Sequence, residues 1–302
     1  METNLNVATV LFGFNRPELI DRRLTELQSI KPKHLLVAID YFDATTTQAF
    51  RELADKYIAT WPTNSEIKFK FQTSNLGLAR HIPDTISNLL LDFENVIVIE
   101  DDIKISPIAF ENFIFGLNYI QSRDEYASVG AFSPLVQKSR KFAFNYFRKS
   151  IYFSCWGWAT NRKSWIKYEQ SIKFEKIEEE LRYSKSWKEL SKLQKKVWID
   201  RFKKISSYPD HTWDIQMQYV TFKHDLSHLI PIFRFADNEG FADSRSTHTK
   251  GARPRWMFSV EPSKARICNV LRFGLIVRIL EIIDSETMIG DRKTLRFLSK
   301  LR

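Results

Sequence analysis

Three consecutive carboxylates, Glu100, Asp101 and Asp102, follow an apolar run in the stretch NVIVIEDDIKIS. Neighbouring carboxylates repel each other, and at the end of a buried strand they also lose water, which is costly unless a cation compensates them. Either the three acids lie in a solvated loop, or they hold a ligand. Mg²⁺ and Mn²⁺ take one or two protein carboxylates while a substrate diphosphate completes the coordination shell. The triplet therefore predicts a metal-bound nucleotide diphosphate. The alternative is that the acids cap the next helix, where a negative charge contributes at most about 1 kcal/mol.

The elements around the triplet alternate between strand-like and helical patterns. The runs NVATVLFGF, HLLVAID, EIKFKFQTS and NVIVIEDD are each followed by a helical pattern, and the first helix has Pro17 where a helix can begin. This alternation predicts an α/β fold with four strands of a parallel sheet before residue 103. Ligands of such sheets bind outside the carboxyl ends of the strands, which makes the triplet a candidate site.

The second half of the chain is less regular than the first. After a further helix and the strand-like YASVGAFSP come an aromatic segment and a lysine-rich helical stretch over residues 172–205, and a helix is expected near residues 267–283. We expect three segments: residues 1–135, residues 136–253 in the same domain, and a basic C-terminal helical segment over residues 254–302.

The block LARHIPDTISNLLLDFENVIVIEDDIKISPIAFENF resembles the N-acetylglucosaminyltransferase I family of GT-A glycosyltransferases. The likeness lies in an apolar strand, the acidic triplet EDD, and a helix that begins just past a proline. The first two strand and helix units, VATVLFGFNRPELIDRRLTEL and HLLVAIDYFDATTTQAF, resemble that family too. The resemblance covers residues 7–113 and the rest loosely. It implies a GT-A type, Rossmann-like sandwich with a mostly parallel central sheet flanked by helices. In that arrangement, residues 1–135 bind the donor nucleotide sugar and residues 136–253 form the acceptor-binding and catalytic half of the same domain.

The same resemblance implies an inverting transfer in which a divalent ion, usually Mn²⁺, bridges the nucleotide diphosphate through a DxD-type motif. The last acid, Asp102, corresponds to the direct metal ligand, and Glu100 and Asp101 lie near the nucleotide and sugar. Nucleotide contacts are expected from the ends of the first two strands and from the helix after the third strand. The candidates are Phe14, Asn15, Arg16, Asp40 and Arg80. Asp40 and Asn15 could instead simply end their strands, and His81 is a rival to Arg80.

An inverting transfer needs a base that takes the proton of the acceptor hydroxyl. Asp214 in HTWDIQMQ is the favoured base, because the resembled family places its base in a comparable Trp-Asp context; its alternative role is a helix N-cap, and Asp210 is the second candidate. His248, in a loop-like segment, is a candidate ligand of the metal or the diphosphate, or else an exposed loop histidine. Trp156 or Trp158 could contact the acceptor, although core packing is preferred.

The formal net charge of +10 over 302 residues predicts an anionic partner. We expect a UDP-sugar donor, UDP-N-acetylglucosamine by analogy, and a glycan or lipid-linked acceptor in surface polysaccharide or glycolipid synthesis. One alternative is a metal-dependent nucleotidyltransferase acting on sugar phosphates, although FGFNRPE is not a glycine-rich phosphate loop. Another is a nucleic-acid binder, which no recognised motif supports.

The chain is expected to be cytoplasmic, because no secretory signal or membrane-spanning run is recognisable. The basic, apolar C-terminal segment could touch the inner face of the membrane, a second subunit, or the protein's own core.

Overall fold

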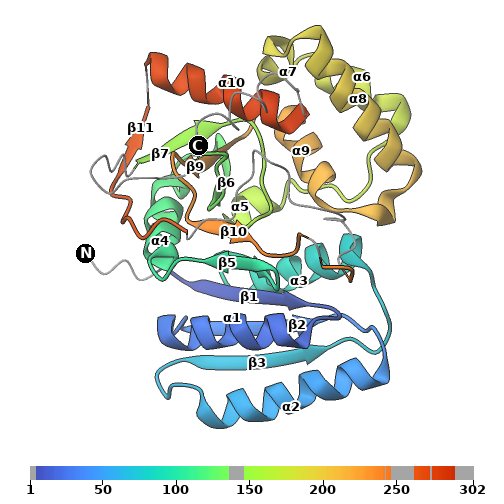
Figure 1. The fold of residues 1–302 in the computed structure, drawn as a ribbon. Coiled ribbons are helices and arrows are strands. Elements are labelled where there is room, and N and C mark those ends of the chain that lie inside the picture. Colours follow the sequence, from blue (N-terminus) through green and yellow to red (C-terminus); the bar gives the residue numbers. More distant parts are fainter. Residues whose placement is uncertain (1–4, 136–145, 242, 246–261, 273, 290–302) are drawn as a thin grey trace.

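The computed structural model of the protein describes residues 5–135, 146–241, 243–245, 262–272 and 274–289 (Figure 1). The first third is the predicted alternation of strands and helices. Its elements are β1 (Val7–Gly13), α1 (Pro17–Ile30), β2 (His34–Ile39), α2 (Ala44–Thr60), β3 (Glu66–Phe71), α3 (Leu78–Asp92) and β4 (Asn95–Glu100). The first helix begins at Pro17, as the sequence predicts, because proline at this position has no N–H to leave unpaired.

The rest of the chain mixes short strands with helices. They are β5 (Ile103–Ile105), α4 (Ala109–Ile120), β6 (Tyr126–Gly130), β7 (Tyr146–Ser150), β8 (Trp158–Asn161), α5 (Arg162–Trp165), η1 (Phe174–Lys176), α6 (Ile177–Leu181), α7 (Lys185–Glu189), α8 (Lys192–Ser207), η2 (Pro209–His211), α9 (Asp214–Lys223), β9 (Ser227–Pro231), β10 (Ala236–Asn238), β11 (Asn269–Leu271) and α10 (Leu275–Ile289).

Nine of the strands form one sheet in the order β11-β7-β9-β6-β8-β4-β1-β2-β3. Five of its eight neighbouring pairs are parallel, and β8 runs antiparallel between β4 and β6. The predicted α/β class with a large, mostly parallel sheet flanked by helices is therefore confirmed as a Rossmann-like arrangement. Strands from before and after residue 135 share this sheet. The division into functional segments at residues 135 and 253 stays a prediction.

Alternation along the strands gives the sheet two apolar faces. Leu11 and Ile99 lie in one buried cluster with side chains of α1, α2 and α4, whereas Val10 and Val98 lie in a second cluster with side chains of α3 and α9. Side chains on a strand point alternately to opposite faces, so both faces are covered only when nearly every strand residue is apolar. This explains the uninterrupted apolar run before the acidic triplet.

The lysine-rich helical stretch over residues 172–205 consists of three short helices, η1, α6 and α7, followed by the 16-residue α8. Its apolar side chains form a third buried cluster that includes Trp187, Trp198 and Phe202 and packs against α9. Leu193, in the first turn of α8, is 59% exposed. The start of α8 is stabilised by a capping box formed by Ser191 and Gln194. It satisfies two backbone N–H groups that have no partner within the helix.

The C-terminal helix packs on the protein's own core. A buried carboxylate on α10, Asp284, accepts hydrogen bonds from both terminal guanidinium nitrogens of Arg148 on β7 and from Ser150, and Tyr152 donates to Ser285. The helix begins later than predicted, because residues 269–271 form β11 beside β7. Among the described residues, no helix is both long and apolar enough to cross a membrane.

Candidate functional site

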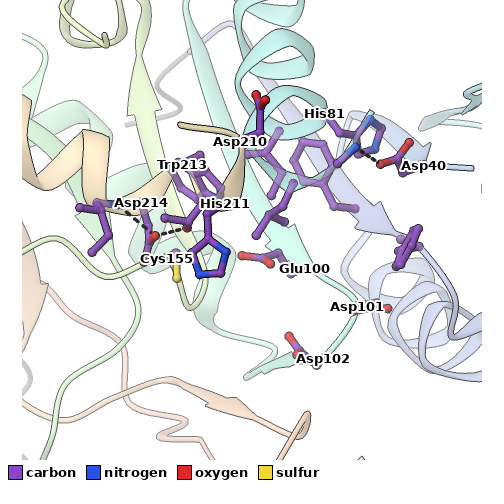
Figure 2. Close-up of a pocket in the computed structure, with 18 of the residues that line it drawn as sticks. Asp40, His81, Glu100, Asp101, Asp102, Cys155, Asp210, His211, Trp213 and Asp214 are labelled. Atoms are coloured by element: carbon purple, nitrogen blue, oxygen red, sulfur yellow. Dashed lines mark hydrogen bonds between the residues drawn. The ribbon is translucent and has the colours of Figure 1, made fainter. Parts of the chain in front are cut away.

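A cavity of about 650 Å³ opens at the carboxyl ends of β1, β2 and β4 (Figure 2). The strand ends form one wall, and α8, η2 and the start of α9 form another. Figure 2 shows Glu100, Asp101 and Asp102 along one side of the cavity and His211, Trp213 and Asp214 along the other, with Cys155 beside them. Its volume lies in the range of small-molecule sites, so the predicted strand-end position coincides with a real pocket.

The acidic triplet lies at the turn between β4 and β5. Glu100 ends β4, and Asp101 and Asp102 are buried in the turn that follows. Strand β5 pairs with β10, and the backbone N–H of Glu239 donates to the Asp102 carbonyl oxygen over 2.7 Å. The small second sheet therefore fixes the turn and brings residues 238–240 against Asp102.

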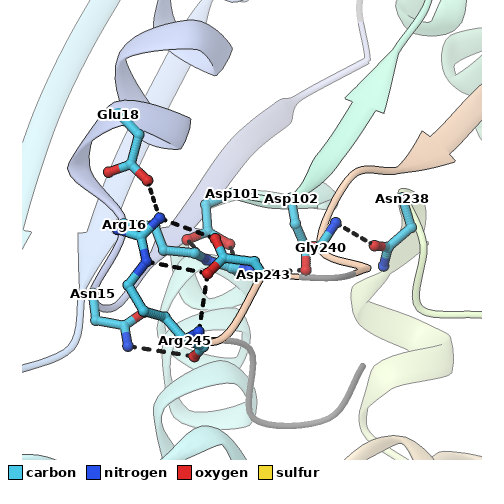
Figure 3. Close-up of polar contacts among 9 residues, drawn as sticks. All are labelled: Asn15, Arg16, Glu18, Asp101, Asp102, Asn238, Gly240, Asp243 and Arg245. Atoms are coloured by element: carbon cyan, nitrogen blue, oxygen red, sulfur yellow. Dashed lines mark hydrogen bonds and ion pairs between the residues drawn. The ribbon is translucent and has the colours of Figure 1, made fainter. Parts of the chain in front are cut away.

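Arg16 supplies a cation to the triplet from the end of β1. Its Nε donates to Asp101 Oδ2 over 3.1 Å, and its Nη2 donates both to Asp101 Oδ1 and, over 3.3 Å, to Asp102 Oδ2 (Figure 3). The remaining nitrogen, Nη1, is buried and has no hydrogen-bond partner among the described residues. One donor of this guanidinium is therefore left for a ligand oxygen, since a buried donor without a partner is unfavourable.

The carboxyl groups of the triplet have raised pKa values. Burial raises the pKa of Asp101 to about 7, helped by the charge of Asp102 and opposed by Arg16. The pKa of Glu100 is raised well above its ordinary value by burial and by the charges of Asp102, Asp101 and Asp214. Burial disfavours the charged Arg16 guanidinium, but the two aspartates outweigh it and raise its pKa. The cluster is a buried site where one arginine faces three acids.

The predicted nucleotide contacts are brought to the pocket with one exception. Phe14 and Asn15 line it, and the Asn15 amide donates to the Arg245 carbonyl oxygen over 3.5 Å. Arg80 does not line the pocket: its side chain is 60% exposed and lies 3.7 Å from Asp210. Its rival His81 does line the pocket, because it is one residue further along α3 and faces the sheet.

Asp40 lines the pocket and also organises its edge. Its carboxylate accepts hydrogen bonds from the backbone N–H groups of Tyr41, Leu76 and Gly77, each over 2.9 Å. Gly77 has a φ of +72°, which a side chain would disfavour. Asp40 thus holds the loop that leads into α3, in addition to the predicted nucleotide role.

The predicted base, Asp214, is the first residue of α9, and the N-cap is Trp213. Its Oδ1 accepts hydrogen bonds from the Ile215 N–H, over 3.0 Å, and from the Thr212 hydroxyl. Its charge raises the pKa values of Glu100 and Cys155, which places it within electrostatic reach of the pocket floor. The runner-up, Asp210, is 74% exposed at its side chain.

Tertiary contacts bring further residues to the pocket that sequence reasoning did not select as site residues. They are Cys155, Arg201, Lys204, His211, Asn238 and Arg245. Of the two tryptophans considered for the acceptor, Trp156 lines the pocket, whereas Trp158 is fully buried and stacks on Trp213. The sequence showed Lys204 only as one of several lysines in a helical stretch. Helical spacing alone could not predict that Lys204 faces the pocket while neighbouring lysines do not. His248 lies outside the described residues.

The donor set at Asp102 fits a divalent ion only in part. Among the described residues, no group of three or more His, Cys, Asp or Glu side chains could hold a metal by itself. Asp102 offers hard carboxylate oxygens, which suit Mg²⁺ or Mn²⁺. Such an ion commonly keeps one or two protein carboxylates and takes its other ligands from substrate phosphates and water. The site therefore fits a metal that arrives with a phosphorylated substrate.

Comparisons with known proteins give no family for this chain. No family model matches it, and no curated protein matches it. Among solved structures, it is similar to HddC from Yersinia pseudotuberculosis, with 12% identity, 53% of this chain and 78% of the other covered, and a TM-score of 0.32. It is also similar to a putative glucose-1-phosphate thymidylyltransferase from Bacillus anthracis, with 8% identity, coverage of 78% and 90%, and a TM-score of 0.37.

A third similar structure is the inositol-1-phosphate CTP transferase from T. maritima, with 15% identity, coverage of 76% and 86%, and a TM-score of 0.35. The predicted resemblance to the N-acetylglucosaminyltransferase I family is wrong, because the second and third of these structures are nucleotidyltransferases by their titles. The physical reason is that an apolar strand ending in acids recurs wherever a parallel strand end meets a metal and a phosphate, whatever the reaction.

Proposed function

We propose that the protein is a metal-dependent transferase whose pocket binds a nucleotide sugar, with the diphosphate at the ends of β1 and β4. The observation that carries this proposal is the Arg16 guanidinium, which is held by Asp101 and Asp102 and whose buried Nη1 has no hydrogen-bond partner within the described part of the chain. A diphosphate oxygen is a suitable acceptor for this nitrogen. Phe14 and Asn15 lie on the same stretch of chain and line the pocket beside it.

The proposed metal, Mn²⁺ or Mg²⁺, would be held by Asp102 and by oxygens of the diphosphate. When bound, such an ion offsets the negative charge that develops on a departing phosphate. Arg16 orients Asp102 through the 3.3 Å contact and neutralises Asp101, so that the two aspartates do not both face the substrate as uncompensated anions. His248 stays a proposed additional ligand.

Two reactions share this ligand. In the first, a nucleotide is transferred to a sugar phosphate and pyrophosphate leaves, which is the kind of reaction that the titles of the similar thymidylyltransferase and CTP transferase name. The attacking phosphate is already ionised near neutral pH, so this reaction needs no protein base. A nucleotide sugar is its product.

The second reaction moves the sugar from the nucleotide, favoured as UDP, to a hydroxyl of a glycan or lipid-linked acceptor. A nucleotide sugar is then the donor, and a nucleoside diphosphate leaves. A hydroxyl nucleophile needs a base, and Asp214 is a carboxylate on the wall that faces the triplet. This placement is the specific observation that keeps sugar transfer as the second candidate.

Thermal unfolding with a panel of UDP-, dTDP-, CDP- and GDP-sugars, with and without Mn²⁺, tests the shared part of the proposal. A ligand at one hundred times its dissociation constant stabilises a fold by about 2.7 kcal/mol. We expect one nucleotide class to stabilise the wild type only with Mn²⁺, and Asp102→Asn to abolish that response. Asp124→Asn is the matched control, because Asp124 is exposed and pairs with Lys163 away from the pocket. A wild type that responds to no nucleotide class would exclude the proposal.

The leaving group separates the two reactions. Nucleoside triphosphate with a sugar 1-phosphate should yield pyrophosphate if the first is correct, and the nucleotide sugar should yield nucleoside diphosphate with an acceptor if the second is correct. Asp214→Asn should leave pyrophosphate release nearly unchanged but should reduce sugar transfer by a factor of about 100 or more. As a control, Asp214→Asn should bind the nucleotide with the same affinity as the wild type.

A further inference from the structure

Two basic side chains, Arg201 and Lys204, line the pocket from α8, on a different wall from the acidic triplet. Neither forms a salt bridge with any described carboxylate. Arg201 donates from Nη2 to the Met288 carbonyl oxygen over 2.8 Å, and its guanidinium lies 4.7 Å from the centre of the Trp198 ring. These contacts fix the guanidinium while leaving its charge without a neutralising partner.

The half-buried position of Arg201 makes that unbalanced charge unfavourable. Burial lowers the pKa of Arg201, and the charge of Asp214 opposes this shift without closing into an ion pair. Lys223, which is also partly buried, lies within 2.8 Å of both Glu169 and Glu180. Partly buried cations are normally paired in this way, whereas Arg201 has no carboxylate within salt-bridge distance among the described residues.

The dipole of α8 accounts for only one of the two cations. Lys204 lies in the last turn of α8, where a positive charge interacts favourably with the carbonyl end of the helix. Arg201 lies more than one turn before the helix end at Ser207, beyond the range of that effect. Arg201 instead donates to the Met288 carbonyl oxygen in the last turn of α10, which favours a positive charge but supplies no carboxylate.

We propose that the second substrate of this transferase carries a phosphate or a carboxylate, and that Arg201 and Lys204 bind this anionic group. The proposal rests on the proposed function, which places the nucleotide at Arg16 and the triplet. A guanidinium and an ammonium one helical turn apart can contact separate oxygens of one anion. Asp214 lies within electrostatic reach of Arg201, so the anion would position the rest of the second substrate near the proposed base.

Calorimetric titration of the full chain with separate ligands tests this inference. The probes are glucose 1-phosphate, glucuronate and neutral glucose, and UDP with Mn²⁺ is titrated independently. We expect Arg201→Gln and Lys204→Gln to weaken binding of at least one sugar anion about ten-fold or more, as is typical of a lost charge-assisted hydrogen bond, and to leave the UDP dissociation constant unchanged. The phosphate and carboxylate probes show which anion the site accepts.

Lys203→Gln is the matched control, because it removes the same charge from the adjacent position of α8. Lys203 is exposed, does not line the pocket and lies over the Phe174 ring. The inference is overturned if no sugar anion binds the wild type at millimolar concentration, if the control weakens binding as much as Lys204→Gln, or if the α8 variants weaken UDP instead. A wild type that binds a sugar anion but no nucleotide supports the anion site and rejects the proposed function.

Discussion

Gly240 lies against the carboxylate of Asp102 so closely that a Cβ atom at position 240 would overlap Asp102 Oδ2 (Figure 3). The neighbouring amide oxygen, Asn238 Oδ1, would be 3.2 Å from the same Cβ atom and already accepts the Gly240 N–H over 2.7 Å. Because the Gly240 N–H is held by Asn238, a side chain at position 240 would be accommodated mainly by displacing the Asp102 carboxylate, the proposed metal ligand.

Gly240→Ala should consequently impair both nucleotide binding and the stability of the fold. We expect the apparent affinity for nucleotide in the presence of Mn²⁺ to fall about ten-fold, because Asp102 must rotate away from its present position. We also expect the free energy of unfolding to fall by about 1–3 kcal/mol. Thermal unfolding with and without nucleotide measures both. Gly130→Ala, remote from the site and with 3.2 Å to Ile230 Cγ2, controls for a general effect of adding a methyl group. Equal nucleotide responses in the two variants would contradict this expectation.

The Arg16 and Asp101 pair should be strongly coupled. Removing one member leaves the other buried and uncompensated, so Arg16→Met should reduce the free energy of unfolding by about 3–5 kcal/mol. The double variant Arg16→Met with Asp101→Asn should lose less than the sum of the single losses, because it removes the Asp101 charge that Arg16→Met alone leaves buried without a partner. Denaturant unfolding of the four proteins gives the coupling energy. Additive losses would mean that the contact contributes little.

The C-terminal helix should be part of the cooperative unit. Asp284→Asn leaves the fully buried Arg148 guanidinium without its carboxylate, and we expect a loss of about 3–5 kcal/mol in the free energy of unfolding. Glu281→Gln on the same helix should be neutral or slightly stabilising, because burial and the charge of Asp284 raise the pKa of Glu281 and disfavour its ionised form. Denaturant unfolding of both variants tests the contrast, and a stable Asp284→Asn would show that α10 is loosely attached.

His228 should make the protein sensitive to mild acid. The buried ring is bonded to the Ser128 and Thr221 hydroxyls, and burial lowers its pKa from 6.5 to about 3. The unfolded chain therefore binds a proton between these values that the folded chain does not, so stability falls as the pH falls below about 6.5. The contribution lost at pH 5 is about 2 kcal/mol.

Denaturant unfolding of the wild type and of His228→Gln at pH 7.5 and pH 5 measures the contribution of His228 to the free energy of unfolding. The glutamine can keep both hydroxyl contacts but cannot ionise, so the variant should lose about 2 kcal/mol less than the wild type between the two pH values. Other titrating groups contribute equally to both proteins. An identical pH dependence would show that the ring is not held neutral.

Local patterns determined much of the fold in advance. The alternation of apolar runs and helical periodicity located β1 to β4 and the helices between them, and Pro17 marked the start of α1, because strand and helix signals lie within a few neighbouring residues. The same local information placed Glu100, Asp101 and Asp102 at the carboxyl end of a buried strand. It could not choose a family, because an acidic strand end is common to different reactions on similar sheets.

The tertiary structure decided what surrounds those acids. Arg16 and Asp101 are separated by 85 positions in the sequence. Arg201, Lys204 and Gly240 come from segments much later in the sequence than the triplet. No periodicity reports such contacts, since they depend on how nine strands are ordered and on which loops meet at one edge of the sheet. The sequence by itself determined that a buried strand ends in acids that need a cation, and the packing of distant segments decided that an arginine supplies one and leaves a donor for the ligand.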